Sequence, residues 1–237
     1  TLQSIPTAAD TTRIARLVAD VERQICAAAD AAGRSRSELT LIAASKTRTA
    51  PEIRAAADAG IRHFGENYLQ EGVDKLTECT DMQATWHFIG ALQGNKTRPV
   101  AEHFDWVHTV DRLKIARRLN DQCPQDKTLN VCLQVNIDAD PNKAGVQPDD
   151  TLTLLSACAP LERLRIRGLM TILHPDTEPA DGYGRLRELF DNLADDAPHH
   201  WDSLSMGMSG DYPAAIAAGA THIRIGTALF GPRKPRQ

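Results

Sequence analysis

The sequence predicts a single (β/α)8 barrel, an α/β fold of the TIM-barrel class, over residues 1–237 with an extra helix at its N-terminus. Three observations support this prediction. Short apolar runs rich in β-forming residues alternate with amphipathic, helix-like stretches. The apolar runs number eight, and no linker or change in composition divides the chain. The length agrees, because barrels of about this size commonly fold as one domain.

The elements follow one another regularly along the chain. We expect an opening helix over residues 7–32, ended by Gly33. An open doubly wound sheet is the alternative, but it is disfavoured because the strands number eight and no G-x-G-x-x-G motif follows the first. The predicted strands cover residues 39–45, 61–64, 85–89, 105–110, 130–137, 165–172, 203–207 and 222–226.

Several of the helices between these strands have recognisable ends. Thr49 is expected to cap one that has Pro51 in its first turn and Gly60 after its last. Residues 112–121 carry apolar side chains at helical spacing, and residues 213–218, ended by Gly219, repeat the helical pattern before the last strand.

Composition excludes several classes of protein. A net charge of −4 gives no basic surface for nucleic acid or an anionic membrane, and the basic segment 233–236 is better explained as a solvated terminus than as a phosphate contact. No apolar run is long enough to span a bilayer, and the first thirty residues carry too many charges for a signal peptide. The five cysteines form no C-x-x-C pair, which argues against structural zinc and disulfides and favours the cytoplasm.

Lys46 is the first candidate for chemistry. The site of a (β/α)8 barrel lies at the carboxyl ends of its strands, and Lys46 follows the first strand after the apolar residues 41–44. Desolvation there would lower the pKa of the amine and make it a nucleophile towards aldehydes. The alternative is a surface lysine that extends into water. Lys96 and Lys143 are the other lysines in candidate loops.

Two glycine-containing segments predict a phosphate site. Residues 205–210 leave the seventh predicted strand and lead into a helix, so backbone N–H groups and the Ser209 hydroxyl can bind an anion. Residues 226–231 leave the eighth strand and can open a short helix, and barrels commonly bind phosphate in these two loops. Ordinary turn formation is the alternative for either segment alone. Together, opposite a reactive lysine, they favour a phosphorylated aldehyde.

Arg224 is the third candidate. The two-residue period of a strand places it on one face with His222 and Gly226, deeper than a phosphate bound at Gly226 and within reach of a ring. A guanidinium keeps its proton, so it would donate to a pyridine nitrogen and leave that nitrogen unprotonated, a poor electron sink. The alternative is an ion pair with a carboxylate inside the barrel.

The same residues carry a resemblance to a known family. The chain resembles the pyridoxal phosphate homeostasis proteins, which are similar to the N-terminal barrel domain of alanine racemase, over about residues 17–231. It departs from the family at Ala91 and Gly94, at residues 138–142 and at Leu173. The motifs are A-S-K-T at 44–47, F-G-E-N-Y-L-Q-E at 64–71, W-H-F-I-G at 86–90, L-Q-G-N-K at 92–96, V-N-I at 135–137, K-A-G at 143–145, R-G-L-M at 167–170, L-S-M-G-M-S at 204–209 and R-I-G-T at 224–227.

This resemblance implies that the cofactor is pyridoxal 5′-phosphate (PLP), held as a Schiff base on Lys46. It also implies that Arg224 lies at the pyridine nitrogen and that Asn67 lines the pocket. The remaining cofactor-binding residues that it implies are Ser209, Gly226 and Thr227 at the phosphate, together with Met208.

Three functions remain open at this point. The family is generally described as carrying or buffering PLP in intracellular vitamin B6 homeostasis, without strong catalysis, and apo PLP-dependent enzymes are the expected partners. The second is an amino-acid racemase or decarboxylase. A racemase needs a second base; the sequence ends six residues past Gly231, where we expect no further domain, and Tyr68 and His87 are better explained by packing. A cofactor-free Schiff-base aldolase does not require Arg224. We expect a monomer or weak homodimer.

Overall fold

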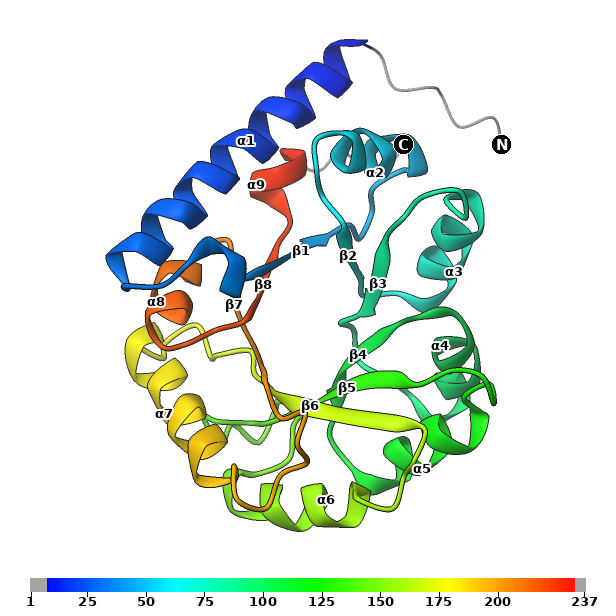
Figure 1. Cartoon of the computed structure of the whole chain (residues 1–237), viewed down its shortest axis with the longest axis vertical. Coiled ribbons are helices and arrows are strands. Elements are labelled where there is room, and N and C mark those ends of the chain that lie inside the picture. The colour runs from blue at the N-terminus through cyan, green and yellow to red at the C-terminus, as the bar shows by residue number, and fades with distance from the viewer. Residues whose placement is uncertain (1–7, 233–237) are drawn as a thin grey trace.

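The computed structural model describes residues 8–232, and these form a closed ring of eight parallel strands (Figure 1). Each strand pairs with the next in the sequence, and the last pairs with the first. The predicted (β/α)8 barrel is therefore confirmed. Its strands are β1 Thr40–Ala44, β2 His63–Glu66, β3 Thr85–Phe88, β4 Trp106–Val110, β5 Leu129–Gln134, β6 Leu164–Met170, β7 Ser203–Met208 and β8 His222–Ile225.

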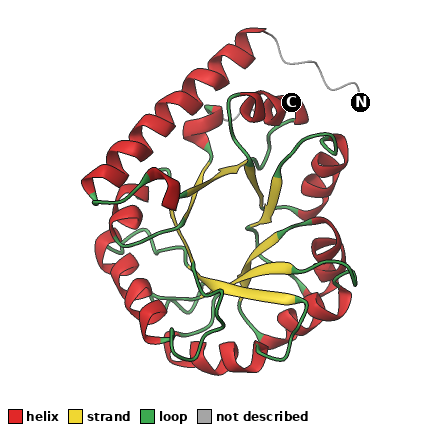
Figure 2. Cartoon of the chain, in the orientation of Figure 1, coloured by secondary structure: helices red, strands yellow, loops and turns green. Residues whose placement is uncertain are grey.

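Helices surround this ring on the outside, as Figure 2 shows. The predicted N-terminal helix is confirmed; its first residue and the basic segment 233–236 lie outside the described residues. None of the described helices is long and apolar enough to cross a membrane. The helices are α1 Ala8–Ala31, α2 Ala50–Asp58, α3 Leu69–Glu78, α4 Thr97–His103, α5 Leu113–Gln122, α6 Thr151–Cys158, α7 Pro179–Asn192, α8 Tyr212–Ala217 and α9 Thr227–Phe230.

Helix ends largely follow the sequence signals. The Thr49 side chain accepts from the Glu52 N–H while the Glu52 carboxylate accepts from the Thr49 N–H, a capping box that starts α2. Gly60 follows α2 in a left-handed conformation (φ 108°), as the prediction required. Along α5, Ile115, Ala116 and Leu119 are buried at helical spacing.

Each strand differs from its predicted bounds by at least one residue, and the shifts are largest in β2 and β5. β2 begins at His63 and not at residue 61, because the Ile61 N–H closes the end of α2 by donating to the Ala56 carbonyl (3.0 Å). β5 ends at Gln134 and not at residue 137, because the chain then bends and Asn136 donates to Val146 of the returning loop (2.9 Å). Both differences come from hydrogen bonds to residues outside the strand.

The core has two layers. Outward-facing strand residues such as Leu41 and Phe64 pack against the helices in one large cluster, whereas a small cluster of Trp106, Cys132 and Met170 lies apart from it. α1 covers one side of the barrel and packs on α2, α8 and α9 (Figure 1). Its buried side chains, spaced three and four residues apart, are Ile14, Val18, Val21, Ile25 and Ala29.

Candidate functional site

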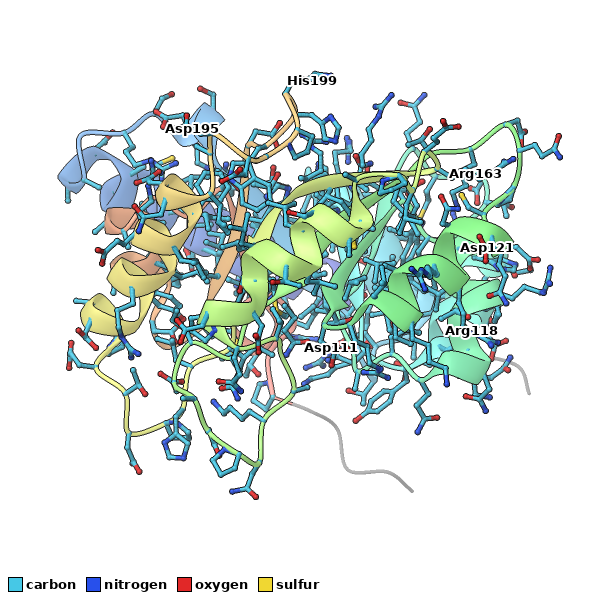
Figure 3. All side chains as sticks on the ribbon, turned by 90° about the horizontal axis from the view of Figure 1, so that it is seen from below. Asp111, Arg118, Asp121, Arg163, Asp195 and His199 are labelled. Carbon is cyan, nitrogen blue, oxygen red and sulfur yellow. The ribbon has the colours of Figure 1, made fainter. Side chains whose placement is uncertain are left out.

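The carboxyl ends of all eight strands lie at one end of the barrel, because the strands are parallel. Figure 3 shows the barrel from the side, with Asp111, which follows β4, near its lower edge. Arg163 and Asp195, which precede β6 and β7, lie towards the upper edge. The loops predicted to hold the site therefore belong to the lower edge in this view.

Lys46 lies in a tight turn directly after β1. The Ser45 N–H donates to the Gly65 carbonyl of β2 (2.9 Å), and the Arg48 N–H donates to the Ser45 carbonyl (3.0 Å) and closes the turn. Thr47 takes a left-handed conformation (φ 65°), which is strained for a β-branched residue. The Lys46 side chain is half-buried at the barrel end.

A buried ionic cluster holds both sides of this turn. Lys75 of α3 donates to the Ser45 carbonyl (2.6 Å), to Glu66 Oε1 (2.9 Å) and to Glu71 Oε1 (2.6 Å). Ser45 Oγ donates to Glu66 Oε1 (2.5 Å), and the Thr47 N–H donates to the Glu71 carboxylate. Burial raises the pKa of Glu66, although Lys75 opposes that shift. The cluster therefore fixes the backbone on either side of the lysine.

The loop after β7 forms a compact turn at the same end. The Met208 N–H donates to Asp211 Oδ1 (2.6 Å), and the Asp211 N–H donates to the Met208 carbonyl (3.1 Å). Ser209 and Gly210 between them are exposed, and their N–H groups have no acceptor among residues 8–232. This turn consequently offers backbone donors to an anion.

The segment after β8 lies between this turn and Lys46. Met208 pairs with Arg224 across β7 and β8, and Ala43 pairs with Ile225 across β1 and β8. A Cβ on Gly226 would lie 3.1 Å from the Ala44 carbonyl oxygen, so β8 approaches β1 closely here. The short helix α9 then begins at Thr227, as predicted.

Arg224 is buried, with 5% of its surface exposed, and it donates inside the barrel. Nη1 donates to Ser205 Oγ (2.7 Å) and Nη2 to the Thr171 carbonyl (2.9 Å). Among residues 8–232 no carboxylate lies within ion-pair distance of it, so the alternative of a barrel ion pair is not observed. Burial lowers the pKa of the Arg224 guanidinium below its ordinary value.

Asn67 follows β2 and brings an unpaired polar atom to the site. Its Oδ1 is buried and has no hydrogen-bond partner among the described residues. The backbone beside it is tightly packed, since a Cβ on Gly90 would lie 1.9 Å from the Asn67 carbonyl oxygen. A buried acceptor without a donor suggests that a ligand completes it.

The predicted site residues thus gather at one end of the barrel. Lys143 lies there as well and donates to the Ile172 carbonyl (3.1 Å), whereas the chain places Lys96 in a short turn before α4. The sequence did not assign a role to Lys75, Glu71 or Ser205. The Glu71–Lys75 spacing of four residues was the available signal, but such pairs are common on exposed helices. Within residues 8–232, no group of three or more His, Cys, Asp or Glu side chains could hold a metal ion.

Fold and site together define a class: a closed barrel with a lysine after its first strand and an arginine on its last. The family model of the alanine racemase N-terminal domain matches residues 22–234. The pyridoxal phosphate homeostasis protein of Pseudomonas aeruginosa is 52% identical over 224 residues, which cover 93% of this chain and 96% of that protein. Its namesake from Escherichia coli K12 is 52% identical over 227 residues, covering 93% and 97%.

A solved structure shows the same relationship. PipY of Synechococcus elongatus, in a structure with PLP bound, superposes with a TM-score of 0.80 at 39% identity, covering 92% of this chain and all of that one. The chain belongs to the pyridoxal phosphate homeostasis protein family.

Proposed function

We propose that this protein binds PLP as a Schiff base on Lys46 and carries or buffers it in vitamin B6 homeostasis. The observation that carries the proposal is Arg224. Its guanidinium is buried without a carboxylate at the barrel end that holds Lys46, and its two hydrogen bonds leave three of five N–H groups free of acceptors among the described residues. The names of the relatives and the PLP in the PipY structure support the same ligand.

The residues present fit PLP. Arg224 can donate to the ring nitrogen, and the unpaired Asn67 Oδ1 supplies an acceptor at the wall of the pocket. Ser209 and the first N–H groups of α9, at Thr227, would hold the phosphate beside Gly226, and Met208 lies on the rim with 37% of its surface exposed.

The surroundings favour carrying over catalysis. PLP, when bound, supplies an electron sink for carbanions, and a protonated ring nitrogen strengthens that sink. Arg224 can only donate, so it would keep the nitrogen unprotonated. The two residues considered as bases are poorly suited: Tyr68 is 58% exposed, and His87 is fully buried between two other histidines.

Absorbance spectroscopy with matched lysine variants tests the proposal. Wild-type protein incubated with PLP should show a visible band, and reduction with borohydride should leave the mass of the cofactor on the peptide that contains Lys46. Lys46→Ala should lose both signals, whereas Lys143→Ala, which removes a lysine at the same barrel end, should keep them. A wild type that takes up no PLP, or a band that survives in Lys46→Ala, would contradict the proposal.

A second assay separates a carrier from an enzyme. Loaded protein is incubated with a panel of amino acids while chirality and carbon dioxide release are followed. Turnover on the order of 1 per second or faster would favour a racemase or decarboxylase. A carrier should instead restore activity to an added apo-aminotransferase without turnover of its own.

We also infer that residues 1–237 form one PLP-binding domain that acts as a monomer or weak homodimer in the cytoplasm. The closed ring and the packing of α1 on α2 and α8 support the single domain. Sedimentation velocity at several protein concentrations tests the oligomeric state, and fractionation tests the location.

A further inference from the structure

The interior of the barrel is unusually rich in histidine. Barrels of this fold are mostly filled by branched apolar side chains. Here His87 of β3, His108 of β4 and His222 of β8 lie around Trp106, and His63 of β2 packs against His87. The contacting rings have centroids 4.9–6.2 Å apart. Buried imidazole nitrogens cost free energy unless they are hydrogen-bonded, and three of these four histidines hydrogen-bond to one another.

Three of the rings form a continuous hydrogen-bonded row, which we call the histidine row. His63 Nδ1 lies 3.0 Å from His87 Nε2, and His87 Nδ1 lies 2.9 Å from His108 Nε2. His108 Nδ1 lies 2.7 Å from Ser205 Oγ, which in turn accepts from Arg224. The row runs from the first residue of β2, near the amino-terminal end of the barrel, to the arginine of the proposed site.

The direction of donation along the row follows from Arg224. A guanidinium has only donors, so the Ser205 oxygen accepts from it and the single hydroxyl hydrogen is left for His108 Nδ1. His108 must then carry its proton on Nε2 and donate to His87. The same reasoning makes His87 donate from Nε2 to His63.

The opposite order is less favourable. If His108 donated from Nδ1, the Ser205 oxygen would accept twice, and its own hydrogen would have no acceptor among residues 8–232. Ser205 is completely buried, so an unmatched hydroxyl hydrogen there costs free energy. Burial also lowers the pKa of His63, and it lowers the pKa of His87 and of His108 well below 6.5, which keeps all three rings neutral.

We propose that His63, His87 and His108 are positioning residues: their shared Nε2–H tautomer orients the Ser205 hydroxyl so that its oxygen holds Arg224 in place for the ring of the cofactor. This role rests on the proposed function for its ligand. The order of protons in the row does not, because every contact in it is made by the protein alone.

Nitrogen NMR of the apo-protein tests the row directly. Long-range ¹⁵N–¹H spectra distinguish the two tautomers of each imidazole. We expect His63, His87 and His108 to be neutral at about pH 7 and protonated only on Nε2. A wild-type His108 protonated on Nδ1 would overturn the proposal, whether or not PLP binds.

Two matched variants test the consequence. His87→Phe breaks the row in its middle and keeps a ring of similar size. Either tautomer of His108 then leaves one buried hydrogen without an acceptor, on His108 Nε2 or on Ser205 Oγ, so His108 should become a mixture of tautomers. His222→Phe removes a neighbouring ring that bonds to Thr221 (2.8 Å) and not to the row, so His108 should keep its single tautomer. Equal spectra of His108 in the two variants would contradict the proposal.

The affinity for PLP supplies a second readout. His87→Phe and Ser205→Ala should each weaken binding about fivefold, the equivalent of one neutral hydrogen bond, and the double variant should lose little more than either. An additive double variant would refute coupling through His108, since no direct bond joins the two residues in the structure. Absence of PLP binding in the wild type would instead refute the proposed function and leave the NMR result to decide the row.

Discussion

Acid should destabilise this protein through the imidazoles inside its barrel. Burial lowers the pKa of His222 from 6.5 to about 3, and it lowers the pKa of His87 and of His108 well below 6.5. Between the lowered and the ordinary pKa, the unfolded chain binds a proton that the folded chain does not, so stability rises with pH. The contribution is complete above about pH 6.5 and is lost as the pH falls towards the lowered values.

The expected loss is large. For His222 alone, a pKa of about 3 in the folded state costs about 2 kcal/mol at pH ~5. His87 and His108 act with the same sign, so the total loss of stability should exceed the loss from His222 alone. Glu66 acts in the opposite direction because burial raises its pKa. The hydrogen bond from Arg54 lowers the pKa of Asp81 to about 2, so Asp81 affects the stability only at lower pH.

Urea denaturation at about pH 7.5, 6 and 5, followed by tryptophan fluorescence, measures this loss. His222→Phe should lose about 2 kcal/mol less than the wild type between the two extremes, because one buried imidazole is gone. His103→Gln, which changes an exposed histidine of α4, is the matched control and should follow the wild type. The reasoning is refuted if the free energy of unfolding is the same at pH 7.5 and 5, or if His222→Phe shows the wild-type loss.

Three further variants test the packing around the site. Lys75→Met leaves the Glu66 carboxylate buried without its cation, so the free energy of unfolding measured in urea should fall by about 3–5 kcal/mol; an unchanged value would show that the cluster contributes little. Gly90→Ala should lower the stability by about 1–3 kcal/mol and also weaken PLP binding, because its Cβ would meet the Asn67 carbonyl oxygen at 1.9 Å. Calorimetry measures the stability and titration measures the PLP affinity. A variant with the wild-type values of both would contradict this packing. Thr47→Asn should raise stability by about 0.5–1 kcal/mol in calorimetry, since asparagine tolerates the left-handed conformation at φ 65° better than threonine; a loss would argue against strain at this position.

The fold could be predicted because its signals are local. Apolar runs and helical spacing depend on residues a few positions apart, and capping depends on pairs such as Thr49 and Glu52. The largest shifts in strand bounds, at His63 and Gln134, depended on bonds to Ala56 of the preceding helix end and to Val146 of the returning loop. No local sequence pattern predicts those hydrogen bonds.

The site could be predicted in part. Position after a strand identified Lys46, and the turn residues around Ser209 and Gly226 identified the adjoining loops, because a barrel brings all strand ends together. The hydrogen-bond partners of Arg224 could not be predicted. An ion pair and a guanidinium without a carboxylate suit the same sequence, and the choice depends on the groups that reach Arg224, which are the Ser205 hydroxyl of β7 and the Thr171 carbonyl after β6.

By itself, the sequence determined the order of strands and helices, the lysine after the first strand and the membership of a family. Tertiary structure alone decided that Lys75 hydrogen-bonds to the turn around Lys46. It also decided that His63, His87 and His108 form one hydrogen-bonded row that reaches Arg224 through Ser205. The physical reason is that secondary structure follows from near neighbours in the chain. Hydrogen bonds inside a barrel join side chains from strands that only ring closure brings together, and their direction is fixed only when every donor and acceptor is counted at once.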